Sequence, residues 1–426
     1  MTADDVVFTV ETARDPATEN NTYGPQLREL VSIESLDSRT VQAVYAEGKV
    51  GSFEAWSVPL LPRHLVSRDA DLITGSFAQH PVGCGPFRFV RHVRGEEIVL
   101  EANDDYWDGR PHIDRLVFKI YPDQRTAYEA LKTGDLDIGG LSSNLFEEAR
   151  RSDAAGQLDS FVYATLRVWP ILWNQDGSNP YFTDPRVRKA LILALDREQF
   201  IDSVIHGLAR PGTTTFHPDT PWADPGLEPR RYDPAEAARL LDEAGWVDSD
   251  RDGIRDRDGR PFSFALLIPQ SPMKLTDHMA SWQQQSWAEI GVKMEIEKLE
   301  WVAFKERRNA HQFEAAAFTL LFTPNPDMFE LYHSTARDSG FNFMGLADPE
   351  IDRLLEEGRR AFDVEARREI YYRLQRRLHE LEPLTCLFYF SSPVVHDQRL
   401  EGVRPSAIGY ARTLDGPRLW RWNESG

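Results

Sequence analysis

The spacing of apolar residues is helical in the stretch Pro180–Gly207, which contains two consecutive helices with clear start signals. Asp184 before Pro185 predicts the cap and the first residue of the first helix, because proline has no N–H to leave unpaired there. Asp196 predicts the cap of the second helix, and Gln199 stands three residues later in the capping-box position. A strand rich in apolar residues, 168–174, precedes this pair. The stretch is therefore expected to be scaffold.

The rest of the chain alternates between the two periods in the order expected of an α/β protein. Strands are predicted at 30–36, 39–45, 87–91, 97–101, 116–121, 136–138, 261–268, 292–297, 313–322, 384–390 and 418–423. Helices are predicted at 3–14, 124–133, 232–246, 276–290, 301–311, 348–361 and 363–380. The strand–helix–strand order within 261–297 predicts a parallel pair of strands.

Length and charge limit the classes of protein that the chain can belong to. At 426 residues with 41% hydrophobic content, we expect two or three folded domains. The formal net charge of −19 argues against nucleic acid as a partner, because a polyanion is repelled by phosphates. Cys84 and Cys386 are too few for a disulfide framework or a cysteine metal cluster, so two buried thiols are expected, with a single bridge as the alternative.

Targeting signals are absent from the printed sequence. No apolar run approaches the roughly 20 residues of a transmembrane helix. The first residues, Met1-Thr-Ala-Asp-Asp, are acidic and enter a helix at once, which is unlike a signal peptide.

Several short motifs occur in a fixed order along nearly the whole chain, and together they resemble the bacterial extracellular solute-binding proteins of family 5, the dipeptide/oligopeptide/nickel type. The motifs are Thr2-Ala-Asp-Asp-Val-Val-Phe8, Pro81-Val-Gly-Cys-Gly-Pro-Phe87, Asn103-Asp-Asp-Tyr-Trp107, Leu131-Lys-Thr-Gly-Asp-Leu-Asp137, Asp184-Pro-Arg-Val-Arg-Lys-Ala190, Leu240-Leu-Asp-Glu-Ala-Gly-Trp246 and Asp348-Pro-Glu-Ile-Asp-Arg-Leu-Leu355. In relatives the first of these helices follows several strands, so the family's N-terminal segment is expected to be missing from this chain.

This resemblance implies an α/β, two-lobed periplasmic-binding-protein fold of type II, in the large class with an extra subdomain, with mixed sheets flanked by helices. Lobe I is expected at 1–168, N-terminally incomplete, with a return at 393–426, and lobe II at 169–392. Hinges are expected near Trp169 and Phe390. The implied function is the receptor of an ABC importer: a monomer, periplasmic or extracellular, that closes over a small solute, delivers it to membrane permease subunits, and catalyses no reaction.

The resemblance places the strand around Trp169, Trp173 and Asn174 at the hinge, and aromatic residues in such clefts bury ligands. These three residues are predicted to bind the solute, with ordinary core as the alternative for Trp169.

A second predicted binding segment is Leu320–Asp327, from which Phe322, Thr323 and Asn325 are candidate ligand contacts. In peptide-binding relatives the matching loop carries a Trp, near Thr319 here, and an Asp that pairs with the ligand's amino terminus, at Phe322 here. Both are absent, which removes the anchor for an ammonium group. Peptide binding is thereby put in doubt, and peptide-like solutes, sugars and opines all stay open.

An acidic loop follows the helix 232–246 and has the alternating oxygen ligands of a calcium loop. The expected ligands are Asp248, Asp250, Asp252, the backbone carbonyl of Ile254, and Asp256. Gly259 stands where an EF-hand has its bidentate Glu. A structural Ca²⁺ site is one interpretation, a solvated acidic turn is the other, and no further cofactor is expected.

Two other functions stay open. A glycosidase on the same scaffold would need two carboxylates converging in the cleft, and the sequence selects no such pair. A sensor that binds solute without transporting it would differ in its partners. The sequence contains no Gly-x-Ser-x-Gly motif, no zinc-type histidine pair and no imidazole cluster for nickel.

Overall fold

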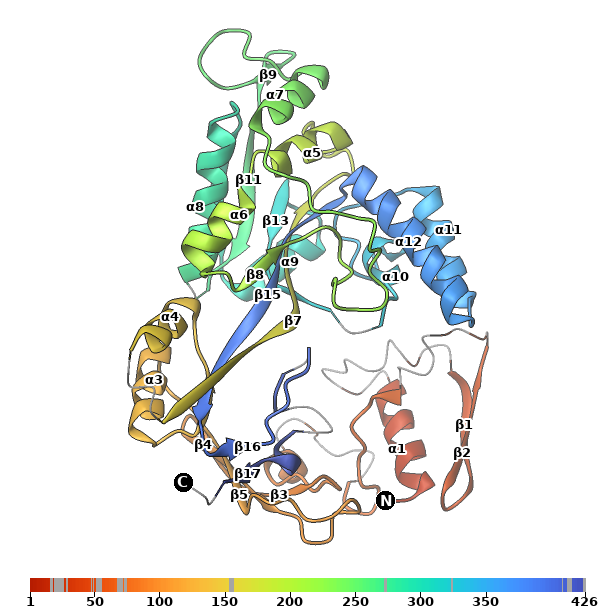
Figure 1. Cartoon of the computed structure of the whole chain (residues 1–426). Coiled ribbons are helices and arrows are strands. Elements are labelled where there is room, and N and C mark those ends of the chain that lie inside the picture. The colour runs from red at the N-terminus through yellow and green to blue at the C-terminus, as the bar shows by residue number, and fades with distance from the viewer. Residues whose placement is uncertain are drawn as a thin grey trace. The chain divides into compact units, whose positions relative to one another are not determined.

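The structure is a computed structural model. It describes residues 1–15, 18, 27, 30–46, 48, 50, 56–66, 72, 75–152, 157–271, 274–322, 325–407, 409–411 and 416–423. The chain divides into two compact units, which we call unit 1 (Met1–Tyr163 and Ser392–Gly426) and unit 2 (Ala164–Ser391). Figure 1 labels their helices and strands.

Unit 1 consists of small antiparallel sheets and short helices. Its elements are α1 (Ala3–Arg14), β1 (Leu30–Asp37), β2 (Thr40–Tyr45), α2 (Ser76–Gln79), β3 (Phe87–Val93), β4 (Glu97–Ala102), β5 (Arg115–Lys119), α3 (Gln124–Thr133), β6 (Ile138–Gly140), α4 (Ser143–Arg151), β16 (Leu400–Glu401) and β17 (Arg421–Trp422). β1 and β2 form the predicted hairpin, and β3, β4 and β5 form an antiparallel sheet. β6 pairs with the end of β15.

Unit 2 is built around a mixed sheet. Its elements are α5 (Pro185–Leu193), α6 (Arg197–Phe200), β8 (Ala209–Pro211), α7 (Pro234–Glu243), β9 (Asp256–Arg257), β10 (Arg260–Pro261), β11 (Ser263–Pro269), α8 (Lys274–Ala288), β12 (Lys293–Leu299), α9 (Trp301–Asn309), β13 (Ala315–Ala317), β14 (Leu320–Leu321), α10 (Phe329–Tyr332), α11 (Pro349–Arg360) and α12 (Val364–Leu381). Two long strands, β7 (Leu158–Trp173) and β15 (Leu384–Asp397), begin in one unit and end in the other.

The strands of unit 2 are ordered β12-β11-β13-β7-β15, with β14 also paired to β7 and β8 to β15. β11 runs parallel to β12 and β13, as the strand–helix–strand order predicts, and β7 runs antiparallel to β13. The α/β fold class predicted from the sequence is confirmed.

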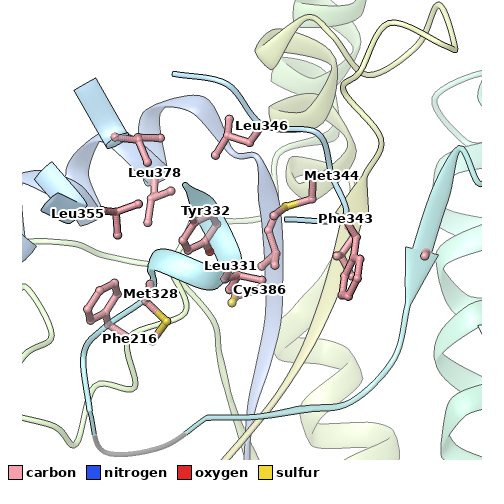
Figure 2. Close-up of a cluster of buried hydrophobic side chains, with 14 of the residues drawn as sticks. Phe216, Met328, Leu331, Tyr332, Phe343, Met344, Leu346, Leu355, Leu378 and Cys386 are labelled. Carbon is pink, nitrogen blue, oxygen red and sulfur yellow. The ribbon is translucent and has the colours of Figure 1, made fainter. Parts of the chain in front are cut away.

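Helices cover both faces of this sheet, because adjacent residues of a strand point to opposite faces. Trp173 packs against Phe182, Phe264 and Trp287 on one face. Leu172 lies in a separate cluster on the other face, which includes residues of α9, α10, α11 and α12. Figure 2 shows part of that second cluster, including the Cys386 side chain from β15.

Aspartate caps set the starts of five helices in unit 2, as their sequence positions predict. The carboxylates of Asp184, Asp196, Asp233, Asp348 and Asp363 each accept a hydrogen bond from a backbone N–H in the first turn of the helix that follows. These helices are fixed locally, and the sheet needs only to supply their apolar partner surface.

Three predictions are corrected by the structure. The second helix of the pair is α-helical only over α6 and continues as a π-helical turn, Ile201–Ile205. The strand predicted at 313–322 is divided into β13 and β14. Both cysteines are free, but only Cys386 is buried, since Cys84 is exposed.

A buried arginine fixes the long loop between β8 and α7, which has no regular structure of its own. The Arg197 side chain is 3% exposed. Its Nη1 donates to the Gly212 carbonyl at 2.7 Å and its Nη2 to the Arg230 carbonyl at 2.6 Å. Burial lowers the pKa of Arg197 to about 10, so the guanidinium stays charged at neutral pH. Both ends of the loop are therefore held by one side chain.

No helix among the described residues is long and apolar enough to cross a bilayer.

The loop's dependence on Arg197 is tested by Arg197→Met, which keeps apolar volume but removes the donors. Buried carbonyls without donors cost about 1–3 kcal/mol each, so we expect unfolding free energy to fall by about 2–4 kcal/mol in urea denaturation. Arg239→Met is the control, because Arg239 is exposed on α7 and bonds only to neighbouring glutamates. Equal stability of the two variants would contradict a role for Arg197 as a clamp.

Candidate functional site

Trp173, predicted to contact the solute, lies in the core of unit 2. It is fully buried, and its indole N–H donates to Thr385 Oγ1 at 2.9 Å. Three aromatic rings pack around it. The prediction for Trp173 is corrected, because the faces of its ring and its one donor are already occupied by protein.

Asn174 is likewise a structural residue. Its Nδ2 donates to the carbonyl oxygens of His311 and Phe313, at 3.1 and 2.9 Å, and its Oδ1 accepts from the Asp176 backbone N–H at 3.1 Å. The residue has no exposed surface. Asn174 therefore ties the end of β7 to the chain before β13, which corrects its assignment as a ligand contact.

Trp169 is buried at 5% exposure, and its Nε1 has no hydrogen-bond partner among the described residues. β13 and β14 pair with β7 in one constant register, Ala315 opposite Trp173 and Leu320 opposite Val168. The register places Thr319, which is exposed, opposite Trp169 on the same face. Nothing in this arrangement tests a ligand role for Trp169, which stays a prediction.

The segment that follows β14 is anchored to the protein rather than left open. Phe322 is half-buried against the core cluster shown in Figure 2, and its N–H donates to the Leu166 carbonyl at 3.0 Å. Asn325 Oδ1 accepts from the Asp327 N–H at 3.1 Å. Thr323 lies outside the described residues. Phe322 and Asn325 thus stabilise the fold of the loop, and their contact with a solute stays a prediction.

The electrostatics of this segment do not favour an ammonium group. Asp327 is the single acidic residue between Thr319 and Asp327, and its Oδ2 accepts from Arg359 Nε at 2.8 Å. The Arg359 guanidinium also lies over the Phe329 ring, 3.7 Å from its centroid. A carboxylate that is paired in this way is a poor anchor for a second cation.

At the same edge of unit 2, Leu321 has 70% of its surface exposed, beside Arg167 in the register with β7. The segment therefore presents an apolar side chain where the resemblance led us to expect polar anchors.

The acidic loop brings together three of its predicted ligands. Carboxylate oxygens of Asp248, Asp250 and Asp256 lie within 4.8 Å of one another. Asp252 does not join them, because its Oδ1 accepts from the Ile254 N–H at 2.7 Å. Carboxylate oxygens are suitable ligands for Ca²⁺, so the trio fits that ion, and calcium binding stays a prediction.

Among the described residues, this trio is the one group of three or more His, Cys, Asp or Glu side chains with converging ligand atoms. It contains no imidazole and no thiolate, the ligands that favour nickel.

The prediction centred on 168–174 missed the first half of β7. That strand begins at Leu158 and carries two aromatic residues, Phe161 and Tyr163, at alternating positions. Their alternation is visible in the sequence, but the polar residues between them hid the strand. Their partner, Tyr410, comes from the distant tail, and no local pattern identifies it.

Comparison with known proteins agrees with this architecture. The family model "Bacterial extracellular solute-binding proteins, family 5 Middle" matches residues 1–342. Oligopeptide-binding protein AppA of Bacillus subtilis is 30% identical over 418 residues, covering 95% of this chain and 75% of the relative. Protein XP55 of Streptomyces lividans is 31% identical over 430 residues, covering 97% of this chain and 74% of the relative. The solved structure of B. subtilis AppA with a nonapeptide has a TM-score of 0.81 at 28% identity, and covers 100% of this chain and 84% of that one.

Calcium binding at the acidic loop is tested by thermal unfolding with Ca²⁺ or EDTA. We expect Ca²⁺ to raise Tm and Asp250→Asn to abolish the rise, because the variant loses a charged ligand of the trio. Asp258→Asn is the matched control, since Asp258 lies in the same loop but outside the trio. A Tm that is the same in Ca²⁺ and EDTA would identify the loop as a solvated turn.

Proposed function

Because the chain belongs to the bacterial extracellular solute-binding proteins of family 5, we propose that it captures a small solute between two hinged lobes and delivers it to ABC permease subunits. The lobes are proposed to be the predicted segments, 1–168 with 393–426, and 169–392. The observation that carries the proposal is the family match, which extends over residues 1–342. The division of the chain into two units, with β7 and β15 passing from one to the other, supports it.

We place the protein outside the cytoplasmic membrane, in the periplasm or at the cell surface, where it acts as a monomer and meets the membrane through its transporter. The family's description as extracellular supports this location. Closing over a solute shifts the population from an open to a closed form, and the permease then recognises the closed form.

The solute is a peptide-like compound, a sugar or an opine that presents no free ammonium group to the loop 319–327. The names of the relatives support peptide-like solutes. The loop supports the second half of the statement, because Phe322 stands where peptide-binding relatives are expected to carry an acid and Asp327 is paired with Arg359.

The receptor makes and breaks no bond in its solute. The glycosidase alternative requires two carboxylates on either side of a scissile bond. The converging carboxylates of the acidic loop are already explained as a cation site or a turn.

The proposal is tested by a thermal-shift screen over free peptides, N-acetylated peptides, sugars and opines, followed by mass spectrometry of each solute that binds. A solute at about 100 times its Kd adds about 2.7 kcal/mol to stability, which gives a clear rise in Tm. We expect at least one solute to bind and to be recovered unchanged, and N-acetylation of a peptide to cost no affinity.

Two results would contradict this proposal. Conversion of a bound solute into product would identify an enzyme. Tighter binding of free than of N-acetylated peptides would show that the protein has an ammonium anchor after all.

A further inference from the structure

Three aromatic rings of unit 1 form a corner at the start of β7. Phe161 and Tyr163 stand two residues apart on the strand, so both point to one face. Tyr410, from the tail, meets each of them edge to face: its ring centroid lies 6.3 Å from Phe161 at 79° and 6.4 Å from Tyr163 at 80°. All three side chains are half-buried. We call these three residues the aromatic corner.

The surrounding residues hold the aromatic corner in place. Tyr410 stacks on Trp420, which is 3% exposed, with ring centroids 6.2 Å apart and planes at 20°. Ser406 and Gly409 exchange backbone hydrogen bonds of 2.8 and 3.0 Å just before Tyr410. Phe161 contacts the His396 ring of β15, 5.7 Å between centroids. The rings are therefore pre-positioned, which lowers the entropic cost of binding a partner.

The two phenol oxygens of the aromatic corner have no hydrogen-bond partner in the part of the chain that the structure describes. Other buried tyrosines of the chain do have one: Tyr389 Oη donates to the Thr214 carbonyl at 2.6 Å, and Tyr332 Oη donates to Thr215 Oγ1 at 3.2 Å. Burial, and to a smaller extent the neighbouring Tyr163, raise the pKa of Tyr410. That phenol therefore stays protonated at neutral pH, and it can both donate and accept.

The aromatic corner carries no charge of its own. The nearest charged neighbours in sequence, Asp397 and Arg399, pair with each other through hydrogen bonds of 3.0 and 2.8 Å. An uncharged aromatic wall with neutral hydroxyls at its rim does not suit a carboxylate or an ammonium group. It suits an uncharged ring that has an apolar face and hydroxyl groups at its edge.

We propose that Phe161, Tyr163 and Tyr410 form a subsite for the pyranose ring of a neutral saccharide. The ring's C–H face packs on the aromatic walls, and its hydroxyls exchange hydrogen bonds with the two phenol groups. This inference rests on the proposed receptor function and chooses the sugar among the three solute classes. No bond forms or breaks at the subsite.

The test uses isothermal titration of the whole protein with a panel of neutral saccharides (glucose, xylose, cellobiose, maltose and xylobiose) and a panel of N-acetylated, amidated peptides containing Phe or Tyr. At least one saccharide is expected to bind. Tyr163→Phe and Tyr410→Phe are each expected to raise its Kd about 3- to 10-fold, the usual effect of removing one neutral hydrogen bond. Tyr410→Ala, which also removes a wall, is expected to raise it further.

Tyr106→Phe is the matched control, because Tyr106 is a half-buried tyrosine of unit 1 whose ring contacts Trp107 rather than the aromatic corner. It should leave the saccharide Kd unchanged. Far-ultraviolet circular dichroism and Tm of all variants distinguish a lost contact from a lost fold.

Each other outcome overturns the inference in a recognisable way. Binding of blocked aromatic peptides but no saccharide, with the same dependence on Tyr163 and Tyr410, would show that the subsite takes an aromatic side chain instead. Solute binding that is indifferent to both substitutions would remove the subsite and leave the receptor function standing. If no peptide, sugar or opine binds the wild-type protein, the receptor function fails as well.

Discussion

A single buried hydrogen bond joins the two strands on which the account depends. Thr165 Oγ1, on β7, donates to the Phe390 carbonyl, on β15, at 2.7 Å, and β7 and β15 are neighbours in the sheet. The chain divides into its two units within two residues of this bond on each strand, after Tyr163 and after Ser391. The bond therefore fastens both connections together on the unit 2 side. We expect bending between the lobes to be confined to the strand segments just beyond it.

Within unit 2, polar groups are largely committed to holding the scaffold. Arg197 clamps the loop before α7, Asn174 binds the chain before β13, and Asp327 is paired with Arg359. Buried polar atoms must be paired, so these groups are costly to redirect toward a solute. The unpaired phenol groups of the aromatic corner are the contrast, and they are the reason that we assign solute chemistry to unit 1 as well.

Local signals made most of the fold predictable, whereas the candidate site depended on contacts that the sequence does not show. Asp184 and Asp233 fix helix starts because a cap acts within one turn. The face of a buried strand is decided by distant elements, so Trp173 was predicted to be a ligand contact although helices cover it on the far side. Tyr410 reaches β7 only through the tail's return to unit 1, which no periodicity indicates.

The central claim is that the protein closes over a solute and leaves it intact. Small-angle X-ray scattering of the protein, alone and saturated with a solute that binds it, tests closure most directly. The account predicts a smaller radius of gyration in the bound state, restored when the solute is removed by dialysis. An identical scattering curve with and without bound solute would contradict it.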